Sequence, residues 1–219
     1  MTADVVAGAV LVPVAALTLR EVKHRRELLF ALLPAIFAVH QFLEVAVWAG
    51  LDGDVSAGTA NLAMRAYLFI AWPLLPTYVP LAVLMLEPRR ARLRVAPFVA
   101  LGTVVSAYLG YVVLAYPVEV IRHSRGLEYD TDTHYPILWA VLYIVAVIGP
   151  ALLSGYRSIV AFGALNLVGL VLVAVFYANE FASLWCVFAA ASSVLILVHM
   201  IRRRRLPDEQ RLHGDPVLT

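Results

Sequence analysis

Residues 28–51 read LLFALLPAIFAVHQFLEVAVWAGL, and this stretch decides what kind of protein the chain is. Its length matches the roughly 20 apolar residues with which a helix crosses a hydrocarbon core of ~30 Å. Within it, His40, Glu44 and Trp48 follow one another at intervals of four residues, so they lie along one face of a helix. An ionisable pair in such a run costs several kcal/mol unless it is satisfied or used.

The composition of the whole chain is typical of a membrane protein. Of its 219 residues, 62% are hydrophobic, and the mean hydropathy is +0.84, whereas soluble domains are about 45–50% apolar. The length suits one compact helical bundle without a second folded domain. The chain begins MTADVV, with no basic residue before the apolar run, so we do not expect a cleaved signal peptide.

Six further apolar runs accompany residues 28–51, and each predicts a membrane-spanning helix. They cover about residues 4–19, 61–86, 95–118, 136–155, 159–178 and 182–201. The predicted fold is therefore all-α, a bundle of seven transmembrane helices over residues 1–205 with a short polar tail at 206–219. Three prolines in the third run, Pro73, Pro76 and Pro80, are expected to bend that helix.

The loops between these runs alternate in charge. The basic loops are REVKHRR at 20–26, RRARLR at 89–94, the turn that holds Arg157, and RRRR at 202–205. The opposite loops are LDGDVSAGTAN, EVIRHSRGLEYDTDTHYP and ANEFAS. Because basic loops face the cytoplasm, the pattern predicts an outer N-terminus and a cytoplasmic C-terminus.

With this orientation the candidate chemistry lies in the outer half of the bundle. Glu44 is about 16 residues, or roughly 24 Å, from the cytoplasmic end of its helix. The second unusual acid is Glu180 in FYANEFASLWC, at the outer junction of the last two helices. Further outer groups are Arg65, Tyr67, Tyr116, Glu119, His134, Tyr135 and Trp139. The inner half is expected to offer only its basic loops.

Structural explanations compete with functional ones for several of these residues. The tryptophans near helix ends fit an aromatic belt, Glu180 fits a helix N-cap, and Arg65 fits a snorkelling flank residue. Asn166, in the middle of an apolar run, is expected to be an interhelical hydrogen-bond partner. A structural pair is also open for His40 and Glu44, but an ionisable residue inside a membrane is by default a functional hypothesis.

Two single residues exclude whole classes of protein. The only cysteine, Cys186, excludes an internal disulfide, a CxxC redox pair and a cysteine-ligated cluster. The only lysine, Lys23, lies in a basic loop, so the chain has no lysine inside the bundle for a retinal Schiff base.

Three functional hypotheses remain for His40 and Glu44. A metal site would use their spacing, with His134 or Glu180 completing the ligands. A proton relay or transporter would use the same acids, but it needs a polar path to the inner face. The third hypothesis is acid chemistry on an apolar substrate, because a carboxyl group in hydrocarbon stays neutral and can protonate an alkene or epoxide.

A carbocation formed in this way needs a dry cavity lined by aromatic faces, which contribute ~2 kcal/mol when desolvated. A second carboxylate can tune the acid or take the final proton. The candidate aromatic residues are Trp48, Tyr67, Trp72, Tyr116, Trp139, Tyr143, Tyr177, Phe181 and Trp185.

These features resemble the integral-membrane terpene cyclases, small seven-helix enzymes of meroterpenoid and prenylated-indole or prenylated-diketopiperazine pathways. That family has one acid in an early helix and another near the start of the last. Glu44 and Glu180 match these places, although the fungal members more often carry aspartate at the second. The stretches HQFLEVAVW and SLWC also resemble an uncharacterised family of actinobacterial membrane proteins.

The resemblance implies a cyclase of the bacterial cytoplasmic membrane that protonates a prenyl chain without a metal or other cofactor. Glu44, Glu180 and His40 would be catalytic. The expected partners are a lipophilic prenylated small molecule and the bilayer, without nucleic acid, and a homo-oligomer is an open option. The alternative is a non-enzymatic membrane protein that binds or transports a small lipophile or ion through His40 and Glu44.

Overall fold

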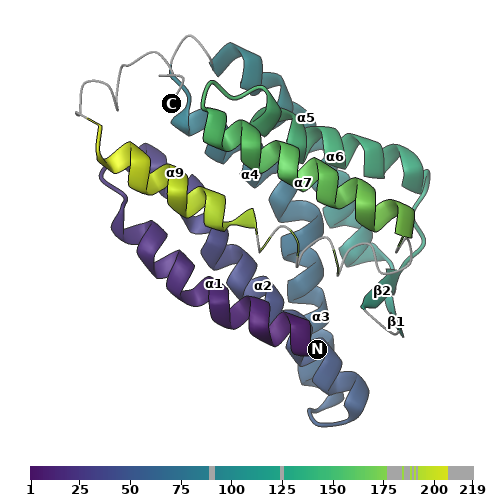
Figure 1. Ribbon diagram of the computed structural model, residues 1–219. Coiled ribbons are helices and arrows are strands. Elements are labelled where there is room, and N and C mark those ends of the chain that lie inside the picture. Colours follow the sequence, from purple (N-terminus) through teal and green to yellow (C-terminus); the bar gives the residue numbers. More distant parts are fainter. Residues whose placement is uncertain are drawn as a thin grey trace.

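The computed structural model describes residues 1–88, 92–123, 126–176, 184, 188, 190 and 192–206. These residues form a helical bundle (Figure 1). Its helices are α1 (Thr2–Arg20), α2 (Leu28–Asp52), α3 (Ala57–Phe69), α4 (Leu75–Leu86), α5 (Arg92–Ala115), α6 (Pro136–Leu152), α7 (Arg157–Phe176) and α9 (Val194–Arg204). A short turn of helix, η1 (Arg25–Glu27), precedes α2, and the π-helical segment η2 (Ile70–Leu74) joins α3 to α4.

The helix count of the prediction is confirmed, because the described residues contain seven helices when α3, η2 and α4 are taken as one. Five are long and apolar enough to cross a membrane, namely Thr2–Arg20, Arg25–Asp52, Ala57–Leu86, Arg92–Ala115 and Arg157–Phe176. Helix α6 has 17 residues and α9 has 11. The last predicted run, 182–201, overlaps α9, and its residues 182, 183, 185–187, 189 and 191 lie outside the described residues.

One helix end differs from its predicted position for a local reason. The fourth apolar run is predicted to end near residue 118, and α5 ends three residues earlier, at Ala115. Pro117 follows closely, and a proline disfavours helical backbone at the residue before it. Tyr116 therefore lies just beyond the helix rather than inside it.

The connection between α5 and α6 is a β-hairpin, which the loop prediction missed. Its strands are β1 (Glu119–Arg122) and β2 (Leu127–Asp130). They pair antiparallel, with Glu119 opposite Asp130. Side chains alternate along β2, so that Leu127 and Tyr129 are buried. The all-α prediction therefore holds for the bundle and fails for this connection.

Helix α2 is central to the bundle. It contacts α1, α3, α4 and α9, while α4 to α7 pack together as a second group (Figure 1). Helix α9 packs against both α1 and α7. The main apolar core lies between these groups and contains Phe30, Leu33, Leu86, Ile159, Ile196 and Met200.

The turn after α2 sets the direction of α3. Gly53 follows α2 with φ +83°, the left-handed conformation that glycine adopts readily, and its N–H bonds to the carbonyl of Ala49 or Gly50. Ser56 then caps α3 by accepting a hydrogen bond of 3.2 Å from the Thr59 N–H. The chain reverses, and α3 packs against α2.

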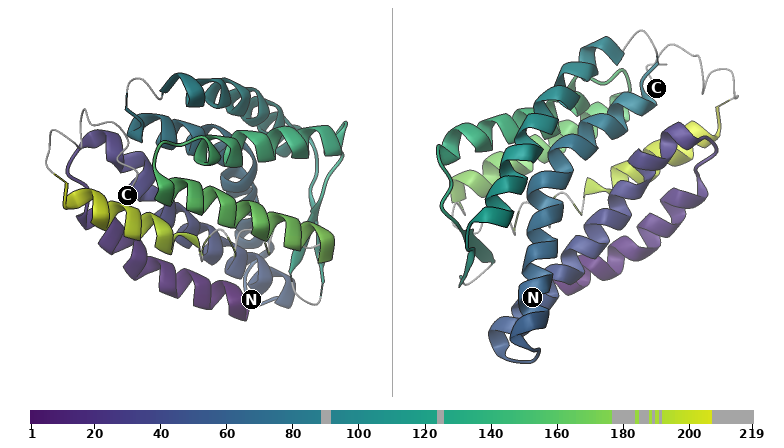
Figure 2. Two further views of the ribbon diagram at one scale, coloured as in Figure 1. Left: turned by 45° about the horizontal axis from the view of Figure 1, so that its top comes forward. Right: turned by 180° about the vertical axis from the view of Figure 1, so that it is seen from behind.

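The proline-rich third run contains a specific distortion rather than a simple bend. Its two α-helices and η2 run on as one helix (Figure 2). In η2 the Leu75 N–H bonds to the Ile70 carbonyl, five residues earlier. Pro76 has no N–H, so it cannot donate the next such hydrogen bond to the Ala71 carbonyl. The Tyr143 hydroxyl donates to the Ala71 carbonyl instead, at 2.6 Å.

The end of the bundle that carries the basic loops holds buried charges, so the prediction that it offers only basic loops is wrong. Arg203 Nε lies 2.8 Å from Glu27 Oε1, and the two side chains are 2% and 0% exposed. Glu87 accepts hydrogen bonds from the Ser154 hydroxyl and the Gly155 N–H. Burial raises the pKa of Glu87, against the opposing effect of these hydrogen bonds.

We predict that Gly102→Ala separates α4 from α5 and destabilises the protein by about 2 kcal/mol or more, as overpacking does. A Cβ on Gly102 would lie 1.8 Å from the Pro76 carbonyl oxygen, which is backbone and cannot turn away. Thermal unfolding in detergent measures the effect. The control is Gly110→Ala on the same helix, where the nearest atom, Pro73 Cβ, is 3.4 Å away. Equal stability of the two variants would contradict the prediction.

Candidate functional site

The predicted polar face of α2 is present and completely enclosed. His40, Gln41 and Glu44 are 1%, 0% and 0% exposed, and Trp48 is also buried. Helix α2 runs through them without a break, which confirms that His40, Glu44 and Trp48 share one buried face. The site is therefore a polar patch inside an apolar bundle.

An aromatic stack begins at this face. The rings of His40 and Tyr67 are stacked with centroids 3.9 Å apart. Tyr67 stacks in turn on Tyr129, at 4.7 Å. The three rings come from α2, α3 and β2, so the stack joins the bundle to the hairpin.

The hairpin is fastened over the end of α2 by Arg122. Its guanidinium lies 5.0 Å from the centre of the Trp48 ring, a distance typical of cation–π contacts. Its Nη2 atom lies 2.5 Å from Asp52 Oδ1, and the two side chains are 45% and 38% exposed. Within the hairpin, His123 and Glu128 form a further pair at 2.6 Å. The strands thus cover the site from outside the bundle.

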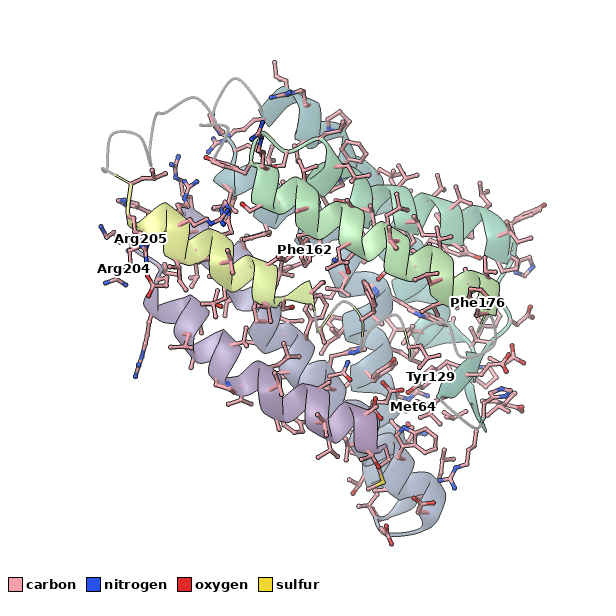
Figure 3. The ribbon with its side chains drawn as sticks, viewed as in Figure 1. Met64, Tyr129, Phe162, Phe176, Arg204 and Arg205 are labelled. Atoms are coloured by element: carbon pink, nitrogen blue, oxygen red, sulfur yellow. The ribbon has the colours of Figure 1, made fainter. Side chains whose placement is uncertain are left out.

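The surroundings of the polar patch are apolar. The buried cluster that contains Trp48, Tyr67 and Tyr129 also includes Val47, Ala63, Met64, Leu68, Val113 and Leu127. Trp72 is half-buried and packs against this cluster. Figure 3 shows Met64 and Tyr129 at the end of the bundle opposite Arg204 and Arg205. The site thus lies beside apolar residues and far from the basic end.

The structure divides the predicted aromatic residues. Trp48, Tyr67 and Trp72 lie in one cluster, but three others have partners elsewhere. Trp139 stacks on Tyr108 at 3.8 Å, and Tyr116 meets Tyr111 edge-on at 6.0 Å. Tyr143 packs against a separate small cluster around Ile148 and Leu170. Helix α6 faces α4, α5 and α7, which directs Trp139 and Tyr143 to those helices.

Other predicted residues are placed as follows. Glu180, Tyr177, Phe181 and Trp185 lie outside the described residues. Arg65 is exposed and donates to Asn61 Oδ1 at 2.9 Å, as expected of a flank residue. His134 is exposed, and its carbonyl accepts from the Tyr108 hydroxyl. Across the described part of the chain, no three His, Cys, Asp or Glu side chains gather as metal ligands would.

Three residues of the site were missed by the sequence analysis. Gln41 directly follows His40 in the apolar run 28–51, and the spacing of four that singles out His40, Glu44 and Trp48 does not include it. Tyr129 and Arg122 belong to a segment treated as a loop. The alternation of Leu127-Glu128-Tyr129-Asp130 is a period of two, and it was the available signal for a strand with one buried face.

A small apolar cavity of about 30 Å³ lies between α2, α4, α6 and α7. It is lined by Leu33, Phe37, Leu75, Val79, Val147, Ile148, Ala151, Phe162, Gly163 and Asn166. Asn166 donates to the Phe162 carbonyl and to Ser192 Oγ, both at 2.8 Å, which confirms its predicted interhelical bond. The cavity reaches α2 at Phe37, one helical turn from Gln41.

Comparison with known protein families shows which family this chain belongs to. A family model described as a family of unknown function (DUF6629) matches residues 1–212. The chain belongs to the DUF6629 family. No curated protein and no solved structure matches it. The matched range includes α2, α3 and the hairpin, so the site of this DUF6629 protein lies inside the region that defines the family.

We predict that Arg122→Gln loosens the hairpin, because it removes both the ion pair with Asp52 and the cation–π contact with Trp48. Hydrogen–deuterium exchange of the strand amides should accelerate roughly two- to tenfold, since each of these contacts is individually weak. The control is Arg65→Gln, which removes an exposed arginine that donates to Asn61 Oδ1 and to the Val113 carbonyl, and to neither strand of the hairpin. Unchanged exchange in Arg122→Gln would show that the arginine does not hold the hairpin.

Proposed function

We propose that this protein is a membrane-embedded terpene cyclase that uses Glu44 to protonate an alkene or epoxide of a prenyl chain. The observation that carries the proposal is the position of Glu44, which is fully buried and shares its helix face with His40 and Trp48. In the proposal its carboxyl group is the positioned acid that supplies the proton.

The proposed reaction needs no group beyond those of the substrate and the site. The Glu44 carboxyl gives its proton to the alkene or epoxide, and the resulting carbocation is attacked by a second double bond of the same chain. Loss of a proton to the Glu44 carboxylate then completes the ring and restores the acid. Trp48 and Tyr129, which belong to the buried cluster at this end of the bundle, are the proposed aromatic faces for the carbocation, while Tyr67 is held between His40 and Tyr129. His40, one helical turn away, orients the carboxyl group.

The proposed setting is the bacterial cytoplasmic membrane, with the basic end of the bundle inside. Three interactions draw the basic segments together at this end. Arg203 pairs with Glu27, Arg204 donates to the Arg20 carbonyl, and the Gly155 N–H donates to Glu87. By the positive-inside rule this end faces the cytoplasm, and Glu44 then lies in the outer half of the bilayer.

Reporter fusions test this orientation. We predict that a reporter placed after Thr219 is active in the cytoplasm, because Arg202 to Arg205 hold that end inside. A reporter placed after residue 54, in the α2–α3 turn, should be active only on the outer side. The reverse pattern would place Glu44 in the inner half and would remove the proposed orientation.

Turnover by Glu44 variants tests the function. We predict that Glu44→Gln keeps the shape of the side chain but lowers cyclisation by ~10²–10⁴-fold, the usual contribution of a positioned acid. The assay uses protein in lipid nanodiscs with a farnesylated phenol and its terminal epoxide, and products are identified by mass spectrometry. His40→Ala should have a milder effect, because the imidazole orients the acid and does not donate the proton.

The matched control is Glu128→Gln, which removes a carboxylate from the same end of the molecule but on the hairpin. Each variant must unfold in detergent at a temperature close to that of the unaltered protein. A folded Glu44→Gln variant that cyclises at the original rate would refute the role of Glu44. A variant that does not fold would instead make Glu44 a structural residue.

A second candidate function is non-enzymatic binding or transport of a small lipophile or ion. The observation behind it is the same buried pair, His40 and Glu44 one helical turn apart, which would contact a bound lipophile or ion whether or not a reaction follows. Uptake into proteoliposomes driven by an ion gradient, with no conversion of the probe, would support this candidate over the cyclase.

A further inference from the structure

Gln41 is a buried amide that has no hydrogen-bond partner among the described residues. Its side chain is 0% exposed, and neither Oε1 nor Nε2 bonds to any residue that the structure describes. Trp48 Nε1 also bonds to no residue that the structure describes. More than nine in ten buried polar groups in proteins are hydrogen-bonded, so a cluster of exceptions calls for an explanation.

Asn166 shows that this bundle satisfies an amide when the amide is structural. It is also buried, and it donates to the Phe162 carbonyl and to Ser192 Oγ. Both side chains belong to membrane-type helices in the same molecule. Within the described residues, Asn166 is satisfied and Gln41 is not, and this difference is the observation from which the inference starts.

Helical geometry places Gln41 between the acid and the cavity. Glu44 and Trp48 follow it by three and seven residues, and Phe37 precedes it by four, so all of them share one face of α2. Phe37 lines the apolar cavity. Along this face of α2, the hydrogen-bonding groups of Gln41 and Trp48 are therefore followed by Phe37, which forms part of the apolar wall of the cavity.

We propose that this face of α2 binds the carboxamide head group of a long-chain lipophile, with its chain directed along Phe37 toward the cavity. A glutamine amide offers an acceptor beside donors, and a ligand carboxamide presents the complementary pair. The Trp48 N–H can donate to the second lone pair of the ligand carbonyl. A pure hydrocarbon would leave these groups unmatched, and an anionic head would face Glu44 in apolar surroundings. This inference rests on the proposed function in that the same site holds the substrate on which Glu44 acts.

Binding of three probes to the unaltered protein tests the proposal. Hexadecanamide carries a donor and an acceptor, methyl hexadecanoate carries acceptors only, and hexadecane carries neither. Calorimetry in detergent should give a Kd for the amide about tenfold or more below those of the other two, because a hydrogen-bonding site rejects analogues that leave its groups unpaired. Equal affinities for the amide and the ester would overturn the proposal.

A pair of variants then separates recognition from structure. Gln41→Leu should abolish the preference for the amide and should leave the unfolding temperature unchanged or raise it by about 2–4 °C. Asn166→Leu, the matched control, should lower the unfolding temperature, since it breaks satisfied hydrogen bonds. If Gln41→Leu keeps the preference, or lowers the unfolding temperature as much as Asn166→Leu, Gln41 has a structural role, such as holding buried water.

The binding assay requires no turnover, so its failure is distinct from failure of the cyclase. If the protein prefers the amide but Glu44→Gln turns over as before, Glu44 is not the acid and the binding site stands. If turnover depends on Glu44 but the amide is not preferred, the amide site is refuted and the cyclase stands.

Discussion

The buried ion pair between Arg203 and Glu27 joins the two ends of the chain. Its partners are 176 positions apart in the sequence, and it fixes α9 against the start of α2. Glu27 also accepts backbone hydrogen bonds from Lys23 and His24, at 3.0 Å and 3.2 Å. Loss of either charge would leave the other buried and uncompensated, which is strongly destabilising. Because α2 carries the candidate site, the position of that site depends on this pair at its opposite end.

The polar groups of the molecule fall into two kinds. At the basic end and in the centre, side chains such as Glu27, Ser154 and Asn166 have partners that link one helix to another. At the other end of α2, Gln41 and Trp48 have none among the described residues. Satisfied groups specify how the helices pack, whereas unsatisfied ones cost stability and are kept where a ligand or reaction uses them. The contrast between these two kinds of polar group is the main physical argument for a functional site here.

The hairpin gives this site a cover that does not belong to the bundle. Leu127 and Tyr129 insert into the apolar cluster, while Arg122 reaches Asp52 at the surface. The inserted residues enlarge the apolar cluster at this end of the bundle, and the exposed ion pair holds the hairpin at its surface.

The sequence by itself determined the features that depend on local spacing and composition. Hydropathy over some twenty residues predicts each long helix, and the i, i+4 spacing places His40, Glu44 and Trp48 on one face, because helix geometry is independent of the rest of the chain. The interhelical role of Asn166 followed from a single polar group in an apolar run.

Only the tertiary structure decided which faces meet. Trp139 and Tyr143 have the composition expected of an aromatic chamber, yet α6 turns toward α4, α5 and α7. Tyr129 reaches the His40 stack because a hairpin folds back over α2, and Arg203 finds Glu27 across nearly the whole chain. These contacts depend on helix orientation and long-range pairing, which local periodicity does not encode.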